Sequence, residues 1–110
     1  MKSKNKVSDG DQLLVVMTAL SNPHRLRIIA ALAKDGRDYV SQLARRIGIS
    51  RPLLHLHLQK LEEAGLVTSK LELSADGKAL NYFEVSDFAL LVTPAMIAAA
   101  AHTLSTNPDQ

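Results

Sequence analysis

Residues 49–67, ISRPLLHLHLQKLEEAGLV, decide the fold. Ser50 can cap a helix, because its hydroxyl accepts a hydrogen bond from a free amide of the first turn, where Pro52 also fits. Gly65 predicts the helix end, since glycine reaches the left-handed conformation without strain. At about 100° per residue, one face of this helix is a leucine stripe. The stripe consists of Leu54, Leu58 and Leu61, with His57 and Ala64 at its edge.

The opposite face of this helix is mixed and carries Pro52, His55, Leu56, Gln59 and Glu63. The charge around it is uneven, because residues 24–60 hold eight Lys/Arg but only two acids, whereas the net charge of the chain is only +2. A segment of that charge suits a phosphate backbone, although a solvated basic surface is an alternative reading. We interpret the mixed face as a surface for DNA.

A second, shorter helix is predicted just before this one. Residues 41–47, SQLARRI, place Leu43, Ala44 and Ile47 inward and Arg45 and Arg46 outward, with Ser41 as the expected cap. Residues 48–50 then form a tight turn that contains glycine. Two helices joined by such a turn are a helix-turn-helix pattern.

After Gly65 the hydrophobic period changes from 3.6 to 2, which predicts a strand over residues 67–73. Asp76-Gly77 is a strong turn signal, and residues 80–85 predict the returning strand, with Phe83 and Val85 facing inward. A helix-turn-helix followed at once by a hairpin is the winged-helix arrangement. The predicted fold class is therefore mainly α with a small β-hairpin wing (α+β).

Helices are also expected at both ends of the domain. Residues 9–20 are apolar over more than one stripe, and residues 93–104 start with a Thr-Pro cap and are rich in alanine, so both need a partner surface. Between them, residues 23–34 predict a helix with Leu26, Ile29, Ala30 and Ala33 on one face. Ile28 and Leu32 lie on a second face, so we expect this helix to be covered on most sides. Residues 87–92 fit either a strand or a helical turn. The expected dimer interface consists of Leu13, Leu14, Met17, Met96, Ile97, Ala100 and Leu104.

The predicted layout is one domain over residues 9–104, with a mobile arm over 1–8 and a tail over 105–110. Within the domain, the recognition helix spans about 51–64, the wing about 66–85 and the dimerisation helix about 93–104. The absence of cysteine excludes a disulfide scaffold, a zinc finger and a thiolate metal sensor. The sequence shows no catalytic motif, signal peptide or bilayer-length apolar run, so we expect a cytoplasmic protein that is not an enzyme and needs no cofactor.

The stretches LSNPHRLRIIAAL, VSQLARRIGIS and LLHLHLQKLEEAGLV resemble the ArsR-type winged-helix transcriptional regulators. The resemblance covers about residues 12–85, and HLQKLEEAGLV is its most specific part. It implies a homodimeric repressor that binds double-stranded DNA, dimerises through its first and last helices and releases its operator on a signal. The chain departs from the metal-sensing members of the family at both of their sites. Residues 39–46 lack the cysteine of one site, and for the Asp/His site on the last helix this chain offers only Asp87 and His102. Metal sensing by either route is therefore not expected.

The predicted DNA contacts follow from side-chain chemistry. Arg can read guanine, Gln can read adenine and Lys can hold a phosphate. His55 and His57 lie about 200° apart on a helix and cannot chelate one ion, so we assign His57 a structural role. Leu56, central on the outward face, can contact thymine methyl groups or can mark a protein-binding surface. The predicted contacts are Arg45, Arg46, Ser50, Arg51, Pro52, His55, Leu56, Gln59, Lys60, Lys70 and Lys78.

Two alternatives stay open. The chain can be a protein-interaction module on the same fold that docks a partner through Leu53 and Leu56. It can also be a sensor of an unknown small-molecule or protein effector. A pocket for a small molecule would lie between the first and last helices, lined by Leu13, Met17, Met96 and Ile97. No membrane partner is expected.

Overall fold

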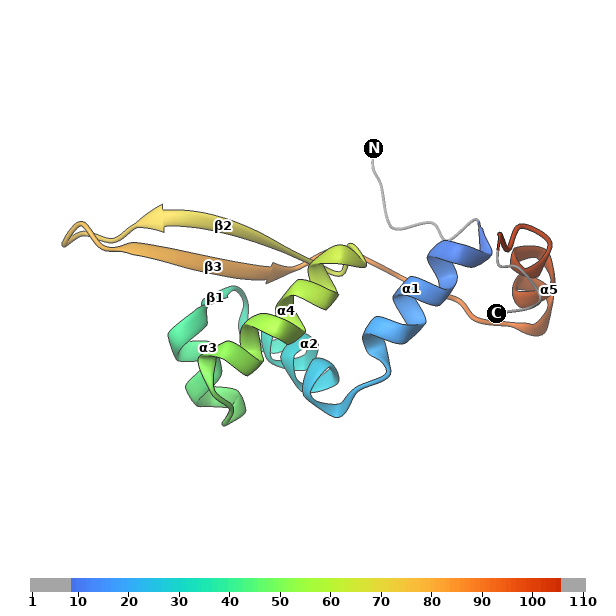
Figure 1. Cartoon of the computed structure of the whole chain (residues 1–110). Helices are drawn as coiled ribbons and strands as arrows, with labels where there is room; N and C mark the ends of the chain where they lie inside the picture. The colour runs from blue at the N-terminus through green and yellow to red at the C-terminus, as the bar shows by residue number, and fades with distance from the viewer. Residues whose placement is uncertain (1–8, 106–110) are drawn as a thin grey trace.

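The computed structural model describes residues 9–105, which form five helices and a three-stranded sheet (Figure 1). The predicted class, mainly α with a β-hairpin, is confirmed. The arm predicted for residues 1–8 and residues 106–110 of the predicted tail lie outside the described range. The elements in chain order are α1 (Gly10–Leu20), α2 (Pro23–Asp35), β1 (Asp38–Tyr39), α3 (Val40–Ile47), α4 (Arg51–Glu63), β2 (Val67–Leu73), β3 (Ala79–Val85) and α5 (Pro94–Ala101).

The helix α4 begins and ends as its sequence dictates. The Ser50 hydroxyl accepts a hydrogen bond of 3.3 Å from the Leu53 amide, and Gly65 follows the helix with a φ of 78°. The cap predicted for α3 is wrong, because this helix begins at Val40 and places Ser41 inside its first turn. The reason is that β1 pairs with β3 up to Tyr39, so the sheet runs straight into the helix.

The leucine stripe of α4 forms the centre of the core, with Leu54 and Leu61 at 0% exposure. Of the two apolar faces predicted for α2, the one with Ile28 and Leu32 enters the core, whereas Leu26 on the other face is 54% exposed, so the cover expected on most sides is wrong for that face. The α2 helix contacts α3, α4 and β3, and this packing selects the Ile28 stripe rather than the Leu26 stripe.

The sheet has the strand order β1-β3-β2, and both pairings are antiparallel. Phe83 pairs with Ser69 across the hairpin and is buried, which confirms the inward face predicted for β3. On its other edge β3 pairs with β1, but at two residues only. The ribbon of β2 and β3 therefore extends beyond the helices as a wing (Figure 1).

The C-terminal segment returns to α1. Residues 87–92 form neither helix nor strand, and α5 packs against α1 at the end of the molecule away from the wing tip (Figure 1). Gly10 allows this contact, because a β-carbon there would lie 2.5 Å from the carbonyl oxygen of Ala100 and 2.6 Å from Leu104. The Gly10 amide donates a hydrogen bond of 2.6 Å to the Thr103 hydroxyl. None of the helices in residues 9–105 has the length and apolarity that crossing a bilayer requires.

Candidate nucleic-acid interface

The outer face of α4 projects away from the core. Its buried side consists of Leu54, Leu58 and Leu61, so at about 100° per residue the line diametrically opposite runs close to Pro52, Leu56 and Gln59. These three side chains are exposed, and Leu56 is 51% exposed. The amide of Gln59 donates a hydrogen bond of 3.3 Å to Glu63, one turn further along the helix. The predicted outward residues of this helix thus share one solvent-facing surface.

One flank of α4 faces the wing. Arg51 and His55 line a cleft of about 220 Å³ together with Ser41 from α3 and Asn81 from β3. Near the other end of α4, the Ser69 hydroxyl on β2 donates a hydrogen bond of 2.9 Å to the Glu62 carboxylate. The wing is therefore tied to α4 near Glu62, and at the N-terminal end of the helix Arg51 faces β3 across the cleft.

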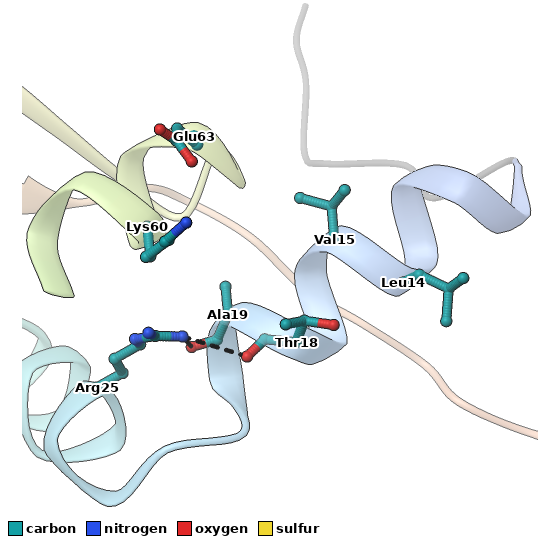
Figure 2. A pocket seen from close by; sticks show the side chains of 7 residues that line it. All are labelled: Leu14, Val15, Thr18, Ala19, Arg25, Lys60 and Glu63. Carbon is teal, nitrogen blue, oxygen red and sulfur yellow. Dashed lines mark hydrogen bonds between the residues drawn. The ribbon is translucent and has the colours of Figure 1, made fainter. Parts of the chain in front are cut away.

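The other flank of α4 faces α1. Lys60 and Glu63 line a groove of about 270 Å³, whose opposite wall is Leu14, Val15 and Thr18 of α1. Figure 2 shows that Lys60 comes from α4 and lies on the side of the groove opposite α1. Of the predicted contacts on this helix, Lys60 is thus the one furthest around toward α1.

Beneath this groove, Arg25 joins three helices. Its guanidinium donates hydrogen bonds to the carbonyl oxygens of Thr18 (3.3 Å) and Ala19 (3.4 Å) at the end of α1, shown as dashed lines in Figure 2. Its Nε also donates to Nδ1 of His57 on α4 at 3.1 Å. Arg25 was not predicted from the sequence. The one indication of such a residue was that His57, at the edge of the buried leucine stripe, needs a polar partner.

The structural role predicted for His57 fits its surroundings. His57 is 5% exposed, and its ring lies 5.3 Å from that of His24. Burial lowers the pKa of His57, and the neighbouring charges of Arg25 and His24 lower it further. Because Arg25 donates to Nδ1, the neutral ring carries its proton on Nε2, for which residues 9–105 provide no hydrogen-bond partner.

The two arginines of α3 have different surroundings. Arg45 is exposed, whereas the guanidinium of Arg46 is held by the carboxylates of Asp35 and of the buried Asp38, the latter at 2.5 Å. Arg46 therefore neutralises a buried acid. Its charge is shared with two internal partners and is less available to a phosphate than that of Arg45.

On its face away from the core, the wing is held to the body of the domain by Arg37, and we call the contact of Arg37 with Glu72 and Tyr82 the brace. Arg37 forms a bidentate ion pair with Glu72 of β2, with N–O distances of 2.6 and 3.0 Å, and its guanidinium lies 4.1 Å from the centre of the Tyr82 ring. The hydrogen bond from Arg37 lowers the pKa of Glu72. Lys70 lies 3.8 Å from the same carboxylate, while Lys78 is exposed at the turn.

The residues predicted for the dimer interface divide into two groups. Leu13 and Ala100 are buried where α1 meets α5 within the chain, and Met96 is half-buried. The remaining four are 41–50% exposed and line an apolar pocket of about 190 Å³ with Gly10 and Ala101. These four are Leu14, Met17, Ile97 and Leu104.

The described residues bring together no group of three or more His, Cys, Asp or Glu side chains that could hold a metal ion. His55 and His57 lie on different sides of α4, the first exposed and the second buried. The arrangement instead offers a projecting helix, a braced hairpin beside it and exposed cations on both.

Comparisons with known proteins agree with this geometry. Residues 20–70 match the model of a family described as a helix-turn-helix domain. An uncharacterized HTH-type transcriptional regulator of Methanocaldococcus jannaschii is 39% identical over 70 residues, which cover 64% of this chain and 72% of that protein. The nodulation protein NolR of Rhizobium meliloti is 31% identical over 91 residues, covering 83% of this chain and 70% of that protein.

Among solved structures, the chain is similar to the homodimeric winged helix-turn-helix DNA-binding domain of a possible ArsR-family transcriptional regulator from Mycobacterium bovis. The TM-score is 0.60 at 31% identity, over 68% of this chain and 64% of that one. NolR from Sinorhizobium fredii gives a TM-score of 0.58 at 25% identity, over 84% of this chain and 80% of that one.

Proposed function

Because the chain belongs to the ArsR-type family of winged helix-turn-helix transcriptional regulators, we propose that it is a homodimeric repressor that binds a pseudo-palindromic operator in double-stranded DNA. The observation that carries the proposal is the outer face of α4, which is exposed, free of the core and flanked by a braced wing. In this mode α4 enters the major groove and the wing meets the flanking backbone or minor groove. The proposal assigns the chain no catalytic step.

The exposed apolar surface of α1 and α5 supports the dimer. Leu14, Met17, Ile97 and Leu104 form an apolar patch on α1 and the α5 segment. The α5 helix lies at the end of the molecule away from the wing tip (Figure 1). Burying such a patch against a second copy removes apolar area from water. The M. bovis domain, whose structure this chain resembles, is homodimeric. A two-fold axis at this patch would present two α4 helices to two half-sites of the operator.

The exposed residues predicted to contact DNA have two kinds of role in the proposal. Arg51, at the N-terminus of α4, and Gln59 read base edges, since helix N-termini usually reach the bases and these side chains match guanine and adenine. Phosphate contacts come from exposed groups around α4 and on the wing. Arg46 is left out because two carboxylates hold it. The supporting set is Arg45, Ser50, His55, Lys60, Lys70 and Lys78, while Pro52, which has no N–H donor, can make only apolar contacts there.

Selection of bound sites from a random DNA pool at near-physiological salt tests the proposal. We expect an enriched inverted repeat whose half-sites lie about one helical turn apart, as docking of two related helices requires. Arg51→Ala and Gln59→Ala should weaken binding to that repeat more than binding to random duplex. Gln12→Ala, an exposed glutamine on α1, is the matched control and should change neither. If no sequence is enriched and a protein partner co-purifies instead, the interaction-module alternative replaces this proposal.

A further inference from the structure

Leu56 occupies a position on α4 where packing does not require an apolar side chain. It is 51% exposed and lies near the line opposite the buried leucines, between Pro52 one turn before it and Gln59 one turn after it. A single exposed leucine is common on protein surfaces and needs no explanation. This leucine differs by its place, because it lies within the surface that the proposed function puts against the bases.

The chemistry of the major groove narrows what Leu56 can contact. An isobutyl group forms no hydrogen bonds, so next to a base edge of donors and acceptors it only displaces their water. The one apolar group that the four bases present in this groove is the C5-methyl of thymine. Binding is therefore favoured when the base that faces Leu56 is thymine. Any other base at this position would lose water from its polar edge without gaining a contact in return.

The position of that base pair follows from helix geometry. With a rise of 1.5 Å per residue, Leu56 lies roughly 7–8 Å along the axis from Arg51 and roughly 4–5 Å before Gln59. Base pairs are spaced at about 3.4 Å along the duplex. The thymine is therefore expected between the bases that Arg51 and Gln59 read, about one base pair from the second.

We propose that Leu56 determines operator specificity by packing against a thymine methyl group in each half-site. This inference rests on the proposed function and adds to it the base that the centre of α4 selects. Burial of one methyl-sized group corresponds to about fourfold in affinity, so two half-sites give roughly fifteenfold. Leu53, on the α1 flank of the helix and 36% exposed, is too far around to share the contact.

Deoxyuridine provides the test, because it keeps the pairing and polar edge of thymine and lacks only the methyl group. The enriched operator is synthesised with thymine replaced by uracil at one half-site position at a time, symmetrically in both halves. We expect one position at which the replacement weakens binding by roughly tenfold to fifteenfold. Leu56→Ala should weaken binding to the thymine operator by a similar factor and be insensitive to uracil at that position.

Two further variants complete the experiment. Leu71→Ala removes an exposed leucine from the wing and should retain the full sensitivity to uracil. Leu56→Gln should shift the selected base at that position from thymine to adenine. Because Leu56 lies outside the core, the thermal midpoints of its variants should match that of the unmodified protein.

The experiment distinguishes a failure of the role proposed for Leu56 from a failure of the proposed function. If the protein enriches an inverted repeat but binds its uracil and thymine forms equally at every position, the role of Leu56 is refuted and the proposed function stands. The role is also refuted if Leu56→Ala keeps the uracil sensitivity. If no duplex is bound specifically, both are refuted.

Discussion

The contact that joins α1, α2 and α4 can be tested by replacing Arg25 with alanine. Arg25 donates hydrogen bonds both to carbonyl oxygens at the end of α1 and, at 3.1 Å, to the side chain of His57. In Arg25→Ala, His57 stays buried with neither ring nitrogen bonded to the protein, since Nε2 already has no partner within residues 9–105. The variant therefore leaves a buried polar group unsatisfied.

The size of the effect follows from that loss. Leaving a buried polar group without its hydrogen-bond partner costs about 1–3 kcal/mol. With a urea dependence of about 1–3 kcal/mol per molar for a small domain, the unfolding midpoint should fall by roughly 1 M. The loss of the neighbouring positive charge should also raise the pKa of His57, because Arg25 is one of the groups that lower it.

Urea unfolding at a constant protomer concentration measures the first effect, since the stability of a dimer depends on concentration. Titration of the His57 ring protons by NMR measures the second effect. Arg27→Ala, two residues further along α2 and exposed, is the matched control and should leave both quantities unchanged. An unfolding midpoint for Arg25→Ala equal to that of Arg27→Ala would refute the idea that this contact stabilises the fold.

Three further predictions concern the ends of the molecule and its charge. Gly10→Ala should weaken the packing of α1 on α5 and thereby dimerisation, because its β-carbon would lie 2.5 Å from a backbone oxygen. Sedimentation in the analytical ultracentrifuge should show a larger monomer fraction, and an unchanged monomer fraction would contradict this prediction. Since burial lowers the pKa of His57, the unfolded chain takes up a proton on this ring first, and the free energy of unfolding should fall as the pH drops below about 6.5. His57→Gln should flatten this fall, and an equal slope in both proteins would exclude His57 as its source. Lys78→Ala should weaken binding to operator and random duplex alike and reduce the dependence of affinity on salt by about one counterion; an unchanged slope would remove Lys78 from the phosphate contacts.

The parts of the fold that the sequence predicted depend on interactions within a few residues. The Ser50 cap, the leucine stripe of α4 and the Asp76-Gly77 turn are local choices, and the structure has each of them. The β-hairpin followed from the change of period after Gly65, since alternation shows directly which side chains face inward.

The parts that the sequence did not predict depend on contacts between distant segments. Arg25 and His57 are 32 residues apart, and a sequence pattern does not pair them. Two apolar stripes on α2 were equally good by periodicity, and only packing on α3, α4 and β3 selects the one with Ile28. The tertiary structure also decides which basic residues remain available, because Asp35 and Asp38 hold Arg46 while Arg45 stays exposed.

The brace on the wing has a consequence for the kinetics of binding. The ribbon beyond Tyr82 has no third strand beside it in the described structure, yet Arg37 reaches across Tyr82 to Glu72 and ties the outer half of β2 to the body. Ordering a free loop on DNA would cost about 1–2 kcal/mol per residue in backbone entropy. A ribbon that is already ordered avoids much of this cost on binding. In the proposed complex, the wing contacts would therefore act mainly by lengthening the residence time on the operator, while the basic surface governs the rate of encounter.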